Sequence, residues 1–193
     1  KMDIKRIDLV EVEDVNKVLL LIDVFGFDAL LLNACHLRKF EYPDKILNRI
    51  ILYSNNKNKS GLITKFLQLT RTDNPLAINK NTDIVTINKI GMKNLIKKRV
   101  RKELGLEVSL SNIRYSSGDS ISKWVKESRC IYKLCKSSGS QFILSSGAKT
   151  ITEMVSTRTI ESILFLLEIE PKNYWKDLSE WLDSKDKIRV IKC

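Results

Sequence analysis

The chain has 193 residues, 43% of them hydrophobic, and its 34 lysines and arginines against 23 aspartates and glutamates give a formal net charge of +11. This length and apolar content exclude a disordered chain and predict one domain, residues 1–193, with a sizeable core. The positive charge predicts a polyanionic partner, with nucleic acid favoured over an anionic membrane surface.

The first half of the chain is predicted to contain five short strands and one clear amphipathic helix. Residues 2–7 open as a strand. A helix follows from Asp14 to Phe25, because its apolar residues recur at helical spacing, and Gly26 supplies a left-handed stop. The other strands are predicted at 28–33, 49–54, 66–70 and 83–87, with a short helix just before the strand at 66–70.

The second half is predicted to be richer in helices. One helix runs from Met92 to Leu104, with an apolar stripe on one side and cations on the other. The remaining elements are a strand at 106–110, a helix at 119–137, a strand at 141–146, a helix capped by Thr157 or Thr159, a helix beginning at Pro171, and residues 187–192 as a last strand or a frayed tail.

About seven strands therefore alternate with helices, which favours parallel pairing through right-handed crossovers. An open doubly wound sheet and a closed barrel both fit this order. A (β/α) barrel usually has roughly 250 residues, with about 200 as its lower range. We predict an α/β fold of the TIM-barrel type, trimmed, with mostly parallel strands and outer helices.

Residues for metal or cofactor chemistry are scarce in this sequence. The four cysteines contain no C-x-x-C pair, which indicates a reducing compartment, and His36 is the only histidine. The sequence has no G-x-G-x-x-G, P-loop or G-x-S-x-G motif, no signal peptide and no apolar run long enough to cross a bilayer. We therefore expect no catalytic residue, no metal and no cofactor on the protein, and no membrane partner.

The segment SQFILSSGAK, residues 140–149, ends a predicted strand in small residues and one cation. Loops that follow parallel strands gather at one face, where function is usually found. Ser145, Ser146 and Gly147 would let backbone N–H groups approach a phosphate, as an anion cradle on the rim, with Lys149 adding charge. The alternative, which the local sequence favours, is a plain turn whose small residues serve packing. A phosphate-binding barrel enzyme remains a second hypothesis for the whole chain.

The segment KKRVRK, residues 97–102, is the densest positive feature. On a helix, Lys97 would lie next to Arg101 and Lys98 next to Lys102, and the repulsion within each pair would be relieved by a polyanion. A solvated basic face explains the run equally well, but the net charge favours nucleic acid. Binding would then be to phosphates and RNA shape rather than to base edges. The candidate RNA-binding residues are Lys97, Lys98, Arg101, Lys102, Arg114, Lys149 and Arg158.

The C-terminal part of the sequence resembles the ribonuclease P protein component 3 family. The resemblance rests on the order of several motifs in Glu107–Ile113, Phe142–Ala148 and Arg158–Leu167, and it covers roughly Leu76 to Leu182. The first 70 residues resemble the family only in MDIK and in the strand order. The family's Asn-Arg-Ala-like run has Asn79 followed by Lys80 here, and the N-terminal half is shorter than usual.

The resemblance implies a TIM-barrel-like scaffold, related to metal-dependent phosphoesterases, that has lost its metal ligands. It implies a non-catalytic protein subunit of ribonuclease P, an endoribonuclease complex that removes the 5′ leader of precursor tRNA. Its RNA subunit, with bound magnesium ions, carries the chemistry. The implied partners are this RNA, a small RRM-like protein subunit and, through the complex, precursor tRNA. The implied location is the cytoplasm for an archaeal source and the nucleus or nucleolus for a eukaryotic one.

Overall fold

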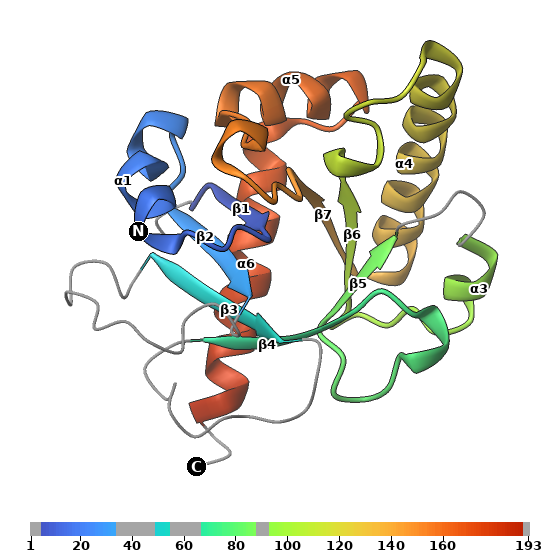
Figure 1. Ribbon diagram of the computed structural model, residues 1–193. Coiled ribbons are helices and arrows are strands. Elements are labelled where there is room, and N and C mark those ends of the chain that lie inside the picture. Colours follow the sequence, from blue (N-terminus) through green and yellow to red (C-terminus); the bar gives the residue numbers. More distant parts are fainter. Residues whose placement is uncertain (1–4, 34–48, 55–66, 88–92, 191–193) are drawn as a thin grey trace.

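Seven parallel strands, hydrogen-bonded in the order of the sequence, form a nearly closed barrel with helices around it (Figure 1). The structure is a computed structural model that describes residues 5–33, 49–54, 67–87 and 93–190. The strands are β1 (Ile7–Val10), β2 (Ala29–Asn33), β3 (Ile50–Ser54), β4 (Gln68–Thr72), β5 (Ile84–Ile87), β6 (Gly105–Ser109) and β7 (Gln141–Ser145). The helices are α1 (Val15–Phe25), α3 (Lys93–Lys97), α4 (Gly118–Ser138), α5 (Thr157–Leu166) and α6 (Pro171–Val190), with short 3₁₀ turns η2 (Pro75–Ala77), η3 (Leu110–Asn112) and η4 (Ile151–Glu153).

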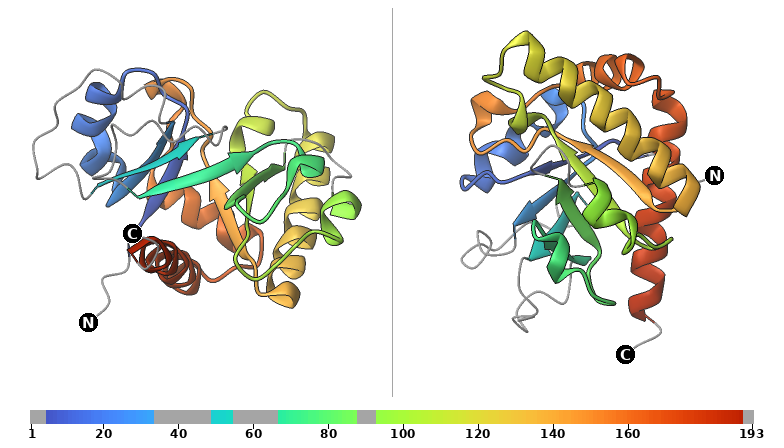
Figure 2. Two further views of the ribbon diagram at one scale, coloured as in Figure 1. Left: turned by 90° about the horizontal axis from the view of Figure 1, so that it is seen from below. Right: turned by 90° about the vertical axis from the view of Figure 1, so that its right-hand side faces the viewer.

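The predicted parallel α/β barrel with outer helices is confirmed. β2, β3, β5 and β7 lie within the predicted ranges, because each is a short run of buried apolar residues between polar breaks. α1 begins after its N-cap Asp14 and ends at Gly26, whose φ of 78° is left-handed as predicted. Figure 2 shows α4 and α6 along the outside of the barrel, where Tyr132 and Tyr174 both contact the Phe142 ring of β7 edge-on.

Several predicted boundaries are wrong by a few residues. β1 lies at Ile7–Val10, so it begins after Lys5 and Arg6, while residues 2–4 of the predicted strand lie outside the described residues. β4 begins two residues later than predicted. The N-cap of α5 is Ser156, whose hydroxyl accepts the Thr159 N–H, not Thr157 or Thr159. α6 continues to Val190, so residues 187–190 are helical rather than a strand. The short helix expected just before β4 lies outside the described residues.

The largest error concerns the helix predicted from Met92 to Leu104. α3 ends at Lys97, and the chain then passes through turns into β6. Lys98, Arg101 and Lys102 are therefore not on a helix, and the predicted pairs of like charges on one helix face do not form. The reason is tertiary: Arg99 and Arg101 turn their guanidinium groups to the carbonyl groups of the loop that precedes β5.

The gap between β1 and β7 is bridged by backbone hydrogen bonds just after β7. The Gly147 N–H donates to the Leu9 carbonyl at 3.2 Å, and the Glu11 N–H donates to the Ala148 carbonyl at 2.8 Å. Apolar residues of all seven strands fill the core together with the inner faces of the helices. In the described ranges, no helix is both long and apolar enough to span a membrane.

Candidate nucleic-acid interface

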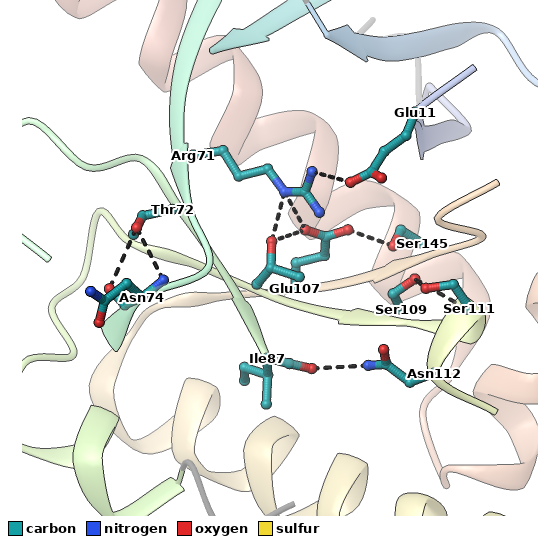
Figure 3. Close-up of polar contacts among 11 residues, drawn as sticks. Glu11, Arg71, Thr72, Asn74, Ile87, Glu107, Ser109, Ser111, Asn112 and Ser145 are labelled. Carbon is teal, nitrogen blue, oxygen red and sulfur yellow. Dashed lines mark hydrogen bonds and ion pairs between the residues drawn. The ribbon is translucent and has the colours of Figure 1, made fainter. Parts of the chain in front are cut away.

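A buried polar network lies inside the barrel, near the carboxyl ends of the strands (Figure 3). Its centre is Arg71 of β4. Arg71 Nε donates to the Thr86 hydroxyl at 2.6 Å and to Glu107 Oε2 at 3.0 Å, and Arg71 Nη1 donates to Glu11 Oε1 at 2.7 Å. The Ser145 hydroxyl completes the network by donating to the other Glu107 oxygen at 2.7 Å. The network therefore joins four strands and the segment after β1 across the barrel.

The Arg71 guanidinium is held as a charged group in the interior. Its charge lies 4.9 Å from the centre of the Tyr53 ring and beside Glu107, which has no exposed surface. Burial by itself lowers the pKa of Arg71, but Glu107 and the other negative neighbours outweigh it, so the net shift is upward. Arg71 therefore keeps its charge and forms a buried ion pair with Glu107 in the interior of the barrel.

Asp8 of β1 is a second carboxyl in the interior and is only 1% exposed. Its Oδ1 accepts the Ser146 N–H at 2.8 Å, whereas no hydrogen-bond partner is found for Oδ2 within the described ranges. Burial raises the pKa of Asp8 from 3.8 to about 7, with a smaller contribution from the charge of Glu107, although hydrogen bonds to Ser146 oppose the shift. Asp8 thus carries a proton across much of the acidic range.

Sequence reasoning missed this interior network. The signal was present, because Asp8, Arg71 and Glu107 are the charged residues within short strands that are otherwise apolar or uncharged. In a barrel, alternate strand residues point inward, so a charge at such a position predicts an interior partner on another strand.

The turn at residues 145–149 has its backbone N–H groups occupied within the chain. Ser146 N–H donates to Asp8 and Gly147 N–H to Leu9, while Ala148 N–H donates to the Ser146 hydroxyl and Lys149 N–H to Glu153. Ser145 and Ser146 have no exposed surface. In this conformation the four amides are all bonded within the chain, which agrees with the packing alternative, and phosphate binding at this turn stays a prediction.

Gly147 is the residue of this turn that could least be replaced. Its φ is +57°, and a Cβ at this position would collide with the Ser109 hydroxyl and lie 2.9 Å from that of Ser111. We expect Gly147→Ala to lower the free energy of unfolding by about 1–3 kcal/mol, measured by urea denaturation. Gly118→Ala is the matched control, because nothing lies within 4 Å of its added methyl group. Equal midpoints for the two variants would contradict this account.

Arg114 also serves the turn at residues 145–149. One of its terminal nitrogens donates to the Ser146 and Glu153 carbonyl groups, both at 3.0 Å, and the other pairs with the Glu153 carboxylate at 3.1 Å. The Lys149 N–H, together with the charge of Arg114, holds the pKa of Glu153 below its usual value. Arg114 is therefore engaged in positioning the turn, unlike Lys149 and Arg158, which are exposed beside it and at the start of α5.

Most of the predicted cations lie at the opposite end of the barrel. Residues 97–102 lead into the amino end of β6, and Lys80 precedes β5, so these side chains belong to the loops at the amino ends of the strands. We call the following six residues the basic cluster: Lys80, Lys97, Lys98, Arg99, Arg101 and Lys102. The sequence predicted a helix face for residues 97–102 and the rim of the strand ends for Lys149 and Arg158. The structure likewise separates the basic cluster from the rim formed by Arg114, Lys149 and Arg158.

Two arginines join the loops of the basic cluster. Arg99 Nη1 donates to the Pro75 carbonyl at 2.8 Å, and Arg101 Nη2 donates to the carbonyl groups of Lys80 and Thr82. These contacts hold the loop before β5 against the loop before β6. The arginines are thus engaged with backbone oxygens, and they bring the lysines of both loops to one surface.

The lysines of the basic cluster are without acidic partners. Within the described ranges, no ion pair involves Lys80, Lys97, Lys98 or Lys102, all of which are exposed. Elsewhere on the surface, lysines pair with acids, as Lys136 does with Asp177 at 2.9 Å. Four neighbouring lysines without an acidic partner among the described residues produce a local positive potential.

The single histidine and two of the four cysteines lie outside the part of the chain that the structure describes. His36, Cys35 and Cys193 lie outside the described residues, and Cys130 and Cys135 are free thiols. In the described part of the chain, no three His, Cys, Asp or Glu side chains are grouped so that they could hold a metal ion.

Comparisons with known proteins give a likeness in structure only. No family model matches the chain. No curated protein matches it in sequence. Among solved structures, it is similar to a chain in a cryo-EM structure of archaeal ribonuclease P with mature tRNA, with a TM-score of 0.63 and 15% sequence identity over 95% of this chain and 92% of that one. At this identity the match establishes a shared fold.

Proposed function

We propose that this chain is a non-catalytic protein subunit of ribonuclease P that binds and stabilises the catalytic RNA during 5′-leader removal from precursor tRNA. The observation that carries the proposal is the shared fold with a chain of archaeal ribonuclease P over nearly the full length of both chains. The order of sequence motifs in residues 76–182 supports the same assignment, because it is a property of the residues that does not depend on the fold.

The protein's contribution would be electrostatic and structural. Lysines of the basic cluster offset the repulsion between RNA phosphates, and Arg99 and Arg101 keep the two loops in place, so that little ordering is required on binding. The RNA subunit with its magnesium ions would supply the chemistry. A small RRM-like protein subunit would be the protein partner, and precursor tRNA would be met through the complex.

The alternative of a phosphosubstrate-binding barrel enzyme has less support. Such enzymes bind phosphate with the loops at the carboxyl ends of the strands. Here the amides of residues 146–149 are all used within the chain, and the interior below them is filled by the pair of Arg71 and Glu107. Binding of a small phosphorylated compound in place of structured RNA would favour the enzyme.

Replacing the four unpaired lysines tests the RNA-binding surface. We expect Lys80, Lys97, Lys98 and Lys102, changed together to Gln, to weaken binding to ribonuclease P RNA in a filter-binding titration. For every phosphate that a lysine no longer neutralises, the slope of log affinity against log salt should become shallower by about 0.7–0.9. Arg101 is left unchanged because it holds the loop before β5. The exposed substitutions should change stability by less than about 0.5 kcal/mol each.

Two comparison variants locate the effect. Lys17, Lys126, Lys172 and Lys176, all exposed, are changed to Gln as a control of equal charge. Lys149→Gln with Arg158→Gln tests the rim. If the variant of the basic cluster binds like the parent, with an unchanged salt slope, the basic cluster is a solvated surface. If only the rim variant is weakened, RNA binds at the carboxyl ends of the strands instead.

A further inference from the structure

A cavity of about 330 Å³ lies between the ends of β5 and β6, η3 and the first half of α4. The described helix that follows β5 is short: the five residues of α3 extend only about 7.5 Å. The loop after α3 then reaches the far end of α4, where the Lys102 side chain lies close to Gly139. On this side, residues of α4 from Ser120 to Ile131 line the cavity.

Five of the ten described residues that line this cavity are apolar. Ile87 and Val108 contribute from the ends of β5 and β6, Ile113 from the turn after η3, and Ile131 from α4. These branched apolar side chains suit an uncharged ring, because they exclude water from the ring surface that they contact. The volume is at the lower end of ligand pockets, which typically measure roughly 300–1,000 Å³, so one ring system fits better than an extended ligand.

Polar groups are placed around these walls. The side-chain amide of Asn112 donates to the Ile87 carbonyl at 3.1 Å, so its side-chain oxygen can serve as a hydrogen-bond acceptor. Ser120 lines the cavity on the first turns of α4. The indole N–H of Trp124, another lining residue, is buried and has no hydrogen-bond partner within the described ranges. An unsatisfied donor of this kind usually marks a missing acceptor.

The charges of the described lining residues disfavour a phosphate inside the cavity. Among these residues there is no lysine or arginine, and Glu127 contributes a carboxylate. A cation lies just outside the cavity. Lys123 is exposed on α4, next to the helix face that carries Ser120, Trp124 and Glu127. The arrangement therefore suits a neutral ring with amino and carbonyl groups on its edge, attached to a phosphate that remains at the surface.

We propose that this cavity binds a single unstacked nucleobase of the bound RNA. The inference rests on the proposed function for its RNA partner and adds a base contact to the phosphate contacts of the basic cluster. Proteins recognise single-stranded RNA by enclosing splayed bases between apolar or aromatic side chains and by hydrogen-bonding their edges. An apolar side chain of a protein partner is the competing occupant, but the polar groups and the unpaired donor favour a base.

Tryptophan fluorescence gives a direct test with free nucleosides as the probe. Trp124, Trp175 and Trp181 are the only tryptophans of the chain, and Trp124 alone lines this cavity. We expect adenosine, guanosine, cytidine or uridine at millimolar concentration to quench the parent, and Trp124→Phe to abolish the quenching. Ser120→Leu should fill the mouth of the cavity and should therefore also abolish the quenching. Ser122→Leu, on the opposite side of α4, is the matched control and should quench like the parent.

RNA binding provides the second readout. Loss of one enclosed base should weaken ribonuclease P RNA binding by about 5- to 150-fold in Ser120→Leu, with the salt slope unchanged, because no phosphate contact is removed. The lysine variant of the basic cluster should show the converse, a shallower slope with nucleoside quenching intact. If no nucleoside quenches Trp124, or if Ser120→Leu binds RNA like Ser122→Leu, the base site is wrong. If the parent binds no RNA but nucleosides quench Trp124, the proposed function fails and the base site stands.

Discussion

Arg71→Met is expected to lower the free energy of unfolding by about 3–5 kcal/mol, because it leaves the Glu107 carboxylate buried without its cation. Glu107 has no exposed surface, and the two hydroxyl groups of Thr86 and Ser145 that remain cannot replace a guanidinium. Urea denaturation of the purified variant measures the loss. An exposed arginine is the control: Arg158→Met should change stability by no more than about 0.5 kcal/mol.

The double variant Arg71→Met with Glu107→Leu separates the net stabilisation by the ion pair from the cost of leaving one charge buried without its partner. Replacing both charges by apolar groups of similar size removes the unpaired carboxylate, so most of the stability should return, to within about 2 kcal/mol of the parent. The two substitutions should thus be strongly non-additive. The loss of stability in the double variant could instead equal the sum of the losses in the two single variants. In that case the network holds the strands together through its geometry rather than through charge neutralisation.

Asp8→Asn is expected to change how stability depends on pH. In the folded chain, burial raises the pKa of Asp8 from 3.8 to about 7, so between these values the unfolded chain ionises while the folded chain keeps its proton. Stability of the parent should therefore be greatest below pH 3.8 with respect to this group, fall as pH rises toward 7, and stay level above it. The decline should amount to about 4 kcal/mol.

The Asp8→Asn variant cannot ionise at this position and should lack that decline. Its stability relative to the parent should improve steadily from about pH 4 to about pH 7, even if the new amide costs a constant amount at every pH. Denaturation curves at several pH values across this range give the difference. Asp183→Asn, exposed on α6, is the control and should run parallel to the parent. A difference between Asp8→Asn and the parent that does not change with pH would show that Asp8 is charged in the folded chain.

The barrel could be predicted from the sequence because strand and helix patterns are local. Runs such as residues 29–33 and 141–145 are short, apolar and bounded by polar residues, and their alternation with helices requires parallel pairing. What escaped prediction depends on contacts between distant residues. α3 stops at Lys97 because Arg99 and Arg101 bind the loop before β5, which no helical periodicity records. Sixty residues separate Arg71 from Glu11, so their pairing could not be read from local patterns.

The candidate site shows the same division. The density of positive charge in residues 97–102 was visible in the sequence, but its position at the amino ends of the strands was not, because the helix was predicted to continue through it. The small residues of 145–148 were equally visible. Only the positions of Asp8, Leu9 and Glu153 show that the N–H groups of this turn are already bonded.

Because β1 bonds to the end of β7, this part of the fold cannot form until β7 has been synthesised. Asp8 and Ser146, which form a hydrogen bond where β1 meets the end of β7, are 138 residues apart in the chain. At about 5–20 residues per second, a ribosome needs roughly 7–28 s to make that stretch. Throughout this interval β1 has only β2 as a hydrogen-bonded neighbour, and its other edge is open to pairing with foreign strands. Nascent chains of this protein should accordingly depend on chaperones until the last strand leaves the ribosome.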